Sequence, residues 1–411
     1  MSLSVPKKKE LIAEYSYAQK CGKFALALET TFALIFLASS NFSRLSDKLD
    51  QAIIIIGISI LPTLLSLAYL LVKNKKRIRD LKPNTKYGHL AKADILDVCD
   101  SVCNKMGIKP GEVGFYITAE KQINASALTL GLGYLIKNLQ VVMLNRATLH
   151  ALKKQELTSV VAHELAHIYR YPLIFQQALV LRLFNSAAIS LSLLTYIPNI
   201  FIVAIINGIY QGFISTWFGR FSITIEFLCD DCGAEIAGAE AALRAEFLIS
   251  KHAETLSDAL YYLLKAKKDG QNLNTKDLAR LLDDSLSYDC LSSEELTAQI
   301  EGNLKNHQAK TQSNFLRHFV SQFFNDNLET EKELEEEFKD LERSRKRTTL
   351  GLPSNHKLDL SWFKEIITKM RSSPETPIFR TQNDFNDDGS SHPGPRRRIL
   401  YLWQEFVEKQ H

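Results

Sequence analysis

An uncharged apolar run at residues 52–72 constrains this chain more than any other feature; its sequence is AIIIIGISILPTLLSLAYLLV. A helix needs about 20 such residues to cross the hydrocarbon core of a bilayer, and this run has that length. Pro62 is tolerated inside such a helix and can kink it. We therefore expect the run to span a membrane.

A second apolar run precedes it at residues 24–43, interrupted by Glu29. The small residues Ala38-Ser39-Ser40 would also suit the end of a cleaved signal peptide. Because the 52–72 run follows so closely, the pattern favours a transmembrane hairpin over residues 24–72. Lysines and arginines crowd before the first run and after the second, so the positive-inside rule predicts that both flanks are cytoplasmic.

The overall composition excludes some functions. A formal net charge of +4 is too small to indicate a nucleic-acid partner. Six cysteines in 411 residues are too sparse for a secreted disulfide framework, which indicates a reducing environment for the soluble part. Cys229 and Cys232 have CxxC spacing and could form a redox pair or supply two zinc ligands. Without a second CxxC, the pattern favours two small residues packed in a helix.

Hydrophobic periodicity predicts a small sheet between two helices. Residues 90–107 have the spacing of an amphipathic helix, and 153–171 form a second helix that ends at Pro172. Between them, the alternating or β-favouring segments 113–118, 125–130 and 141–144 predict three short strands.

A long apolar region follows at 173–218, broken near Tyr196–Asn199. Each half is long enough to cross or enter a membrane, although two buried soluble helices would give a similar pattern. Arg182 lies inside the first half, where it would face a partner or extend to the interface. We expect one further helix from Arg220 to about Ala266.

The remaining chain is more polar. Residues 267–350 are predicted to be helical, with the charged stretch 329–347 as a solvated face. Residues 371–395 are rich in Ser, Pro, Asn, Asp and Gly and predict a flexible segment. A last helix is expected over 396–408.

The segment His163-Glu164-Leu-Ala-His167 carries the chemistry. Residues four apart lie on one face of a helix, so His163 and His167 can bind one Zn²⁺ ion. Glu164 is one position further round the helix, where it can act as base toward a water that the zinc activates. The pattern predicts a metal-dependent hydrolase.

A catalytic zinc needs a third protein ligand and one open position. Glu226, Asp230, Asp231 and Glu235 are the downstream candidates. Glu226 and Asp230 share a helix face, so Glu226 as ligand and Asp230 as the group that orients a histidine would complete the site.

The chain resembles the HtpX-like integral membrane zinc metalloproteases, relatives of the CAAX prenyl proteases. The motifs that carry the resemblance are Asn124-Ala125, Val141–Leu144, Val161–His167, Glu226–Asp230, His392-Pro393 and Arg398-Ile399. Their order, after an N-terminal hairpin and around two apolar helices, is similar to that of the family.

The resemblance implies a mainly α membrane protein with a small β-sheet, a zincin-like α+β catalytic domain and about four transmembrane or membrane-associated helices. It implies one zinc ion per chain, bound by His163, His167 and Glu226, with Glu164 as catalytic base. The strand that begins at Asn124, Ala125 and Ser126 would bind protein or peptide substrates as an added strand.

It further implies a quality-control endopeptidase for misfolded or membrane proteins, in a bacterial inner membrane with its site facing the cytoplasm. The expected organisation is a basic N-terminus (1–23), the hairpin (24–72), a peptidase domain (73–266), an insertion (267–390) and a C-terminal helix of the peptidase domain (391–411).

Two alternatives remain at this stage. One is a CAAX-type prenyl protease, although that group has more membrane spans. The other is a non-catalytic zinc-binding membrane adaptor, although such a protein would not need Glu164. No oligomeric state is predicted.

Overall fold

The computed structural model describes residues 5–39, 75–109, 111–118, 124–129, 140–174, 178–197, 199–268, 331–352, 358–380 and 393–410, with Ile54 and Gly57. The helices are α1 (Lys8–Ser39), α4 (Lys92–Lys105), α5 (Arg146–Ala151), α6 (Lys154–Tyr169), α8 (Leu179–Tyr196), α9 (Ile200–Gly219), α10 (Ser222–Ala237), α11 (Ala239–Lys268), α15 (Glu331–Arg345), α16 (Leu360–Ser372) and α17 (Pro395–Phe406). The strands are β1 (Lys75–Arg77), β2 (Lys86–Tyr87), β3 (Leu90–Ala91), β4 (Val113–Thr118), β5 (Ala125–Thr129) and β6 (Gln140–Asn145), and short 3₁₀ turns lie at Ile78–Asp80 and Glu408–Gln410. The predicted class, mainly helical with a small sheet, is confirmed.

Four strands form one sheet in the order β1-β4-β6-β5. β4 and β6 are parallel, with Val113 opposite Gln140, whereas β5 runs antiparallel to β6 with Ala125 opposite Leu144. The three predicted strands are present, and β4 has the predicted bounds. Among the described residues β5 lies at one edge of the sheet and pairs only with β6.

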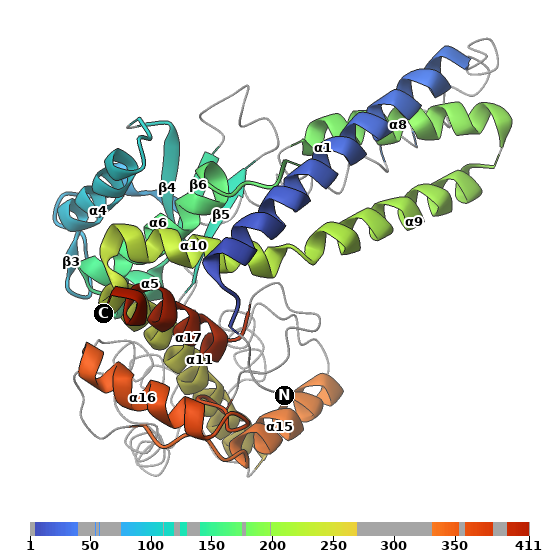
Figure 1. The fold of residues 1–411 in the computed structure, drawn as a ribbon. Coiled ribbons are helices and arrows are strands. Elements are labelled where there is room, and N and C mark those ends of the chain that lie inside the picture. The colour runs from blue at the N-terminus through green and yellow to red at the C-terminus, as the bar shows by residue number, and fades with distance from the viewer. Residues whose placement is uncertain are drawn as a thin grey trace.

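The sheet and helices α4 and α6 share one hydrophobic core. Leu157, Val161 and Leu165 follow one face of α6 at a spacing of four and are fully buried, beside Val142 and Leu144 of β6. Burying each such side chain contributes about 1.5–3 kcal/mol, so this face fixes the orientation of α6. α10 packs along α6, and the two helices together carry the site described below (Figure 1).

The single helix predicted from Arg220 to about Ala266 is instead two helices, α10 and α11. They are separated by Gly238, whose φ of 94° is a conformation that side-chain-bearing residues rarely adopt. Gly238 also closes α10, because its N–H donates to the carbonyl of Ala234. Apolar residues continue on both sides of Gly238, from Ala234 to Ala242, so the sequence pattern does not indicate the break.

Helices α1, α8 and α9 extend together away from the body of the protein (Figure 1). Of the described residues, only Lys8–Ser39 and Phe201–Gly219 form helices long and apolar enough to cross a membrane. The described residues therefore hold two candidate spans rather than about four. Most of the 52–72 run lies outside the described residues.

One face of α9 is an exposed apolar stripe. Phe201, Ile205, Ile209 and Phe213 recur every four residues and are 60–77% exposed. Soluble proteins rarely expose a continuous apolar stripe of this kind, whereas a bilayer covers it.

Glu29, in the apolar part of α1, and Arg182, in α8, face each other. Arg182 of α8 lies 3.8 Å from the carboxylate of Glu29 on α1, and both side chains are buried. Arg182 also donates to Gln211, and Tyr210 donates to Glu29, both from α9. Of the two alternatives for Arg182, the structure has it facing a partner.

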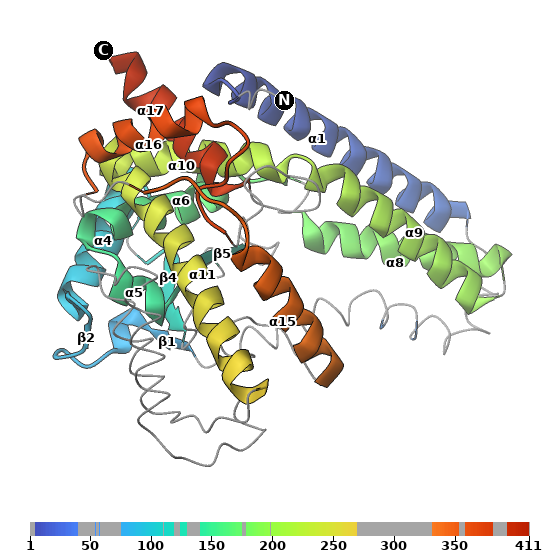
Figure 2. The ribbon, with the colours of Figure 1, turned by 90° about the horizontal axis from the view of Figure 1, so that it is seen from below.

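The C-terminal helices pack on α11 in a second hydrophobic core. Trp362 and Phe363 of α16 contact Phe247 of α11, and Ile399 of α17 belongs to the same cluster. Helix α16, which was not predicted, lies within residues 267–390, and α15 lies beside α11 (Figure 2).

Part of the predicted flexible segment 371–395 is ordered. Arg396 is fully buried and donates to the carbonyls of Met370, Ser373 and Thr376, which hold the turns after α16 in place. Composition alone did not indicate this anchor. Residues 381–392, and with them His392, lie outside the described residues.

Candidate metal centre

His163 and His167 project from the middle of α6 toward one point. Their Nε2 atoms lie 3.2 Å apart, and their rings meet nearly edge to face with centroids 4.9 Å apart. Helical spacing of four residues produces this approach. Both side chains are partly buried, so the pair lies close to the surface of the core.

Glu226 reaches the same point from α10. Its Oε2 lies 3.3 Å from Nε2 of His163, and its Oε1 lies 3.4 Å from Nε2 of His167. Two ligands of a tetrahedral zinc with bonds of about 2.0–2.1 Å lie roughly 3.3–3.4 Å apart. One ligand atom from each of the three side chains lies within 4.8 Å of the other two, so the group is close enough to hold one metal ion.

The electrostatics of the site also suit a cation. Nδ1 of His163 lies 2.9 Å from Oδ1 of Asp230, and a carboxylate can only accept, so the histidine proton is on Nδ1. Nε2 is then the ring nitrogen that can bind a metal once it has lost its own proton. Burial alone would lower the pKa of His163, but Asp230 and Glu226 raise it to about 10. The carboxylates thus stabilise a positive charge where a zinc ion would bind.

Asp230 is held on its other side by Arg398 of α17, whose Nε donates at 2.8 Å. Burial opposes ionisation of Asp230, yet Arg398 and His163 together lower the pKa of this carboxyl. Arg398 also pairs with Glu246 of α11 at 2.8 Å, and burial raises the pKa of Glu246 to about 7. The chain of contacts from Glu246 to His163 fixes the imidazole.

The sequence prediction assigned no role to Glu246 and tied Arg398 only to the family resemblance. No spacing rule connects Asp230, Glu246 and Arg398, because they lie on three helices. The signal in the sequence was an acidic residue, Glu246, directly before the apolar residues Phe247, Leu248 and Ile249.

The other candidates for the third ligand are engaged elsewhere. Asp231 accepts from Tyr401 and pairs with Lys8, whereas Glu235 pairs with Lys8 and Arg170. The structure therefore brings only Glu226, of these acidic residues, into the group with the two histidines.

Cys229 and Cys232 are free thiols with no exposed surface, packed in the core between α1, α6, α10 and α17. Burial raises the pKa of Cys229 well above its usual value, so the thiol is neutral. Two buried neutral thiols fit the packing alternative better than a redox pair or zinc ligands.

Glu164 follows His163 on α6 and is 8% exposed. It is therefore largely withdrawn from bulk water while lying next to a proposed ligand. A carboxylate in such a position can exchange a proton with a reacting group at the metal.

The predicted substrate-binding residues lie at the start of the edge strand β5. The N–H of Asn124 donates to Oγ1 of Thr148, which donates in turn to the carbonyl of Asn124. The Asn124 side chain caps the N–H of Ala125, and Ser126 is exposed. The two bonds between Asn124 and Thr148 hold the start of β5 against α5.

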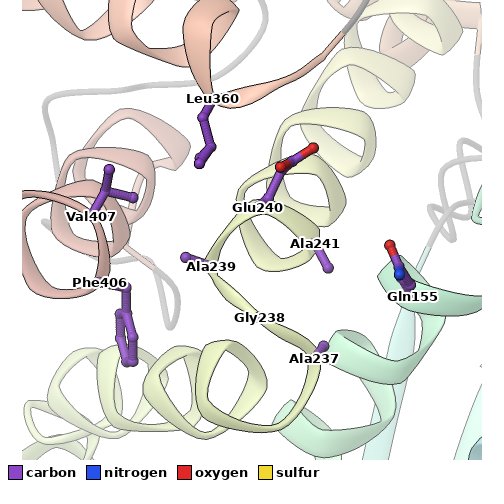
Figure 3. Close-up of a pocket in the computed structure, with 9 residues that line it drawn as sticks. All are labelled: Gln155, Ala237, Gly238, Ala239, Glu240, Ala241, Leu360, Phe406 and Val407. Carbon is purple, nitrogen blue, oxygen red and sulfur yellow. The ribbon is translucent and has the colours of Figure 1, made fainter. Parts of the chain in front are cut away.

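A pocket of about 330 Å³ lies where α10, α11, α16 and α17 meet (Figure 3). It is lined by Gln155, Ala237, Gly238, Ala239, Glu240, Ala241, Leu360, Phe406 and Val407. None of the three proposed metal ligands lines it, so we do not assign it to the reaction.

The model of peptidase family M48 matches residues 89–403, which include every described residue of the site. No curated protein and no solved structure shows a significant match to the chain.

Proposed function

The chain belongs to peptidase family M48, the zinc metallopeptidases that include HtpX and CAAX prenyl protease relatives, and we propose that it is a membrane endopeptidase that cleaves misfolded or membrane proteins at the cytoplasmic face. That it is a metallopeptidase, a hydrolase of peptide bonds, follows from the family. The observation that carries the finer proposal is the convergence of His163, His167 and Glu226, whose possible ligand atoms lie within 4.8 Å of one another.

We assign the site residues as follows. His163, His167 and Glu226 would hold one zinc ion, and Asp230 would orient His163. When bound, zinc lowers the pKa of water to about 7 and polarises a carbonyl. Glu164 accepts the proton of the attacking water at its carboxylate and then donates it to the leaving amide nitrogen. Burial of Glu164 and Glu226 keeps bulk water from screening these charges.

The substrate would bind as an added strand on β5, beginning at Asn124, Ala125 and Ser126. The free edge of β5 among the described strands supports this proposal. Main-chain hydrogen bonds then supply affinity without demanding a sequence, which suits an enzyme that acts on misfolded chains.

Backbone methylation of a peptide substrate tests this binding mode. Each main-chain hydrogen bond contributes about 0.5–1.5 kcal/mol, so N-methylation at one bonded amide should raise KM by roughly 2–13-fold with kcat little changed. Exchanging the side chain at the same position is the control and should change KM less. If side-chain exchange has the larger effect, recognition does not depend on the strand.

The membrane setting rests on α1, α9 and the basic residues that flank the predicted hairpin. Both helices are long and apolar enough to span a bilayer. Lys20 and Lys23 precede the apolar part of α1, which supports a cytoplasmic location for the start of α1 and the catalytic body. A bacterial inner membrane is the setting that fits the HtpX resemblance.

Cleavage by the purified full-length protein tests the function. We expect zinc to restore cleavage of an unfolded model protein after chelator treatment, with little activity toward the folded form of that protein. A prenylated CAAX peptide is the comparison substrate. Preferential removal of its last three residues would transfer the chain to the prenyl-protease class, and no cleavage of either substrate would contradict the endopeptidase proposal.

A further inference from the structure

The first turns of α1 contact α10, which carries Glu226, and the residues just after α6, the helix that carries the two histidines. Lys8, the first residue of α1, places its Nζ 3.0 Å from Oδ2 of Asp231 and 2.8 Å from Oε1 of Glu235. These two acids lie on one face of α10, the helix that contributes Glu226. The start of α1 lies against α10 (Figure 1).

Lys8 compensates a buried charge. The Asp231 side chain has no exposed surface, and its other oxygen accepts from Tyr401 of α17 at 2.9 Å. Lys8 and Tyr401 thus hold Asp231 from opposite sides. Removing the ammonium group would leave the buried Asp231 carboxylate without its counter-charge. An uncompensated buried charge is strongly destabilising, so the groups around Asp231 would be expected to move.

Glu235 extends the connection to α6. Its Oε1 pairs with Lys8 and its Oε2 with Nη1 of Arg170, the residue that ends α6. Arg170 lies three residues after His167. The Arg170–Glu235 pair thus joins the end of α6 to α10, and Lys8 holds the same glutamate from α1.

A second set of contacts joins α1 to the residues just after α6. The hydroxyl of Tyr15 donates to the carbonyl of Pro172 at 3.0 Å, and its ring meets that of Tyr171 edge to face. Gln19 donates to the same carbonyl and accepts from the N–H of Ile174. Four residues separate Tyr15 from Gln19, so both arise from one face of α1.

Apolar packing completes the attachment. Leu11 and Ala18 of α1 are buried in the cluster that contains Ala166 of α6, Leu228 of α10 and Tyr401 of α17. Residues 8–19, which we call the brace, are therefore fixed to the three helices around the site by both ion pairs and packing.

We propose that the brace is a positioning element for the metal centre, and that Lys8 is its principal positioning residue. The proposal rests on the function proposed above. Ligand atoms 3.2–3.4 Å apart tolerate little relative movement of α6 and α10. Because the same helix continues into the candidate membrane span, the brace also connects the membrane-embedded part to the geometry of the catalytic site.

The test uses full-length protein in detergent and the variants Lys8→Met, Lys8→Arg and Lys9→Met. Zinc affinity is measured by competition with a chromophoric chelator, and kcat and KM are measured on an unfolded model protein. Lys9 is exposed and adjacent, so Lys9→Met is the matched control. We expect Lys8→Met to weaken zinc affinity or lower kcat by about 10–100-fold with KM within about twofold. Lys8→Arg should recover most of the loss.

Several outcomes decide the proposal. Zinc affinity and kcat of Lys8→Met that equal those of Lys9→Met would overturn it. A Lys8→Met protein whose lower activity follows only from a lower melting temperature, with unchanged zinc affinity and kcat at low temperature, would reduce Lys8 to a stabilising residue. If the wild type binds zinc but cleaves nothing, the endopeptidase proposal fails, whereas the zinc measurements still test the brace.

Discussion

Replacing Glu164 with glutamine is expected to lower kcat for an unfolded protein substrate by about 10²–10⁴-fold, the usual contribution of a general base. The amide has nearly the shape of the carboxylate but cannot accept a proton from water. Since Glu164 is not among the three residues that converge on the metal position, zinc content should stay at one per chain. Metal analysis and steady-state kinetics on the same preparation measure both effects.

Glu164→Asp is the companion variant. It keeps the carboxylate but withdraws it by one methylene, so its activity should fall between those of the wild type and Glu164→Gln. Equal activity of wild type and Glu164→Gln would sink the assigned mechanism. A loss of zinc in Glu164→Gln would instead mean that this residue supports the metal directly.

The second large effect is expected at Glu226. Glu226→Gln replaces a proposed anionic ligand with a neutral one at the place where both histidine Nε2 atoms lie within 3.3–3.4 Å of the carboxylate. We expect zinc affinity to fall by more than about 100-fold, beyond the usual effect of changing a group that only orients a ligand. Chelator competition measures it.

Asp230→Asn provides the graded control. It changes a carboxylate that contacts His163 through Nδ1 rather than through the proposed ligand atom, so zinc affinity should fall by about 10–100-fold. The reverse order, with Asp230→Asn weakening zinc more than Glu226→Gln, would exchange the roles of these two residues.

The features that could be predicted from the sequence are those that depend on the spacing of residues within one helix or strand. The four-residue separation of His163 and His167 needs only a helix to bring the rings together. The alternation at residues 113–118 was enough for the bounds of β4, because a turn precedes that strand. Helix α16 could have been found by the same means, since Trp362, Phe363, Ile366, Ile367 and Met370 have helical spacing.

What escaped prediction depends on contacts between distant residues. Arg398 meets Asp230 and Glu246 only because α17 packs against α10 and α11. The order after α16 depends on Arg396, a residue type that composition associates with solvent. Gly238 can be seen in the sequence, but it separates α10 from α11 through a positive φ that the sequence does not predict.

The buried pair of Glu29 and Arg182 bears on how the protein is made. Glu29 is synthesised first, and Arg182 follows about 150 residues later, which takes roughly 8–30 s at about 5–20 residues per second. During that interval α1 would carry a carboxylate without its arginine, and an ionised carboxylate is costly within hydrocarbon. If α1 spans the bilayer as proposed, its stable integration should therefore wait for α8, although α1 is synthesised before α8.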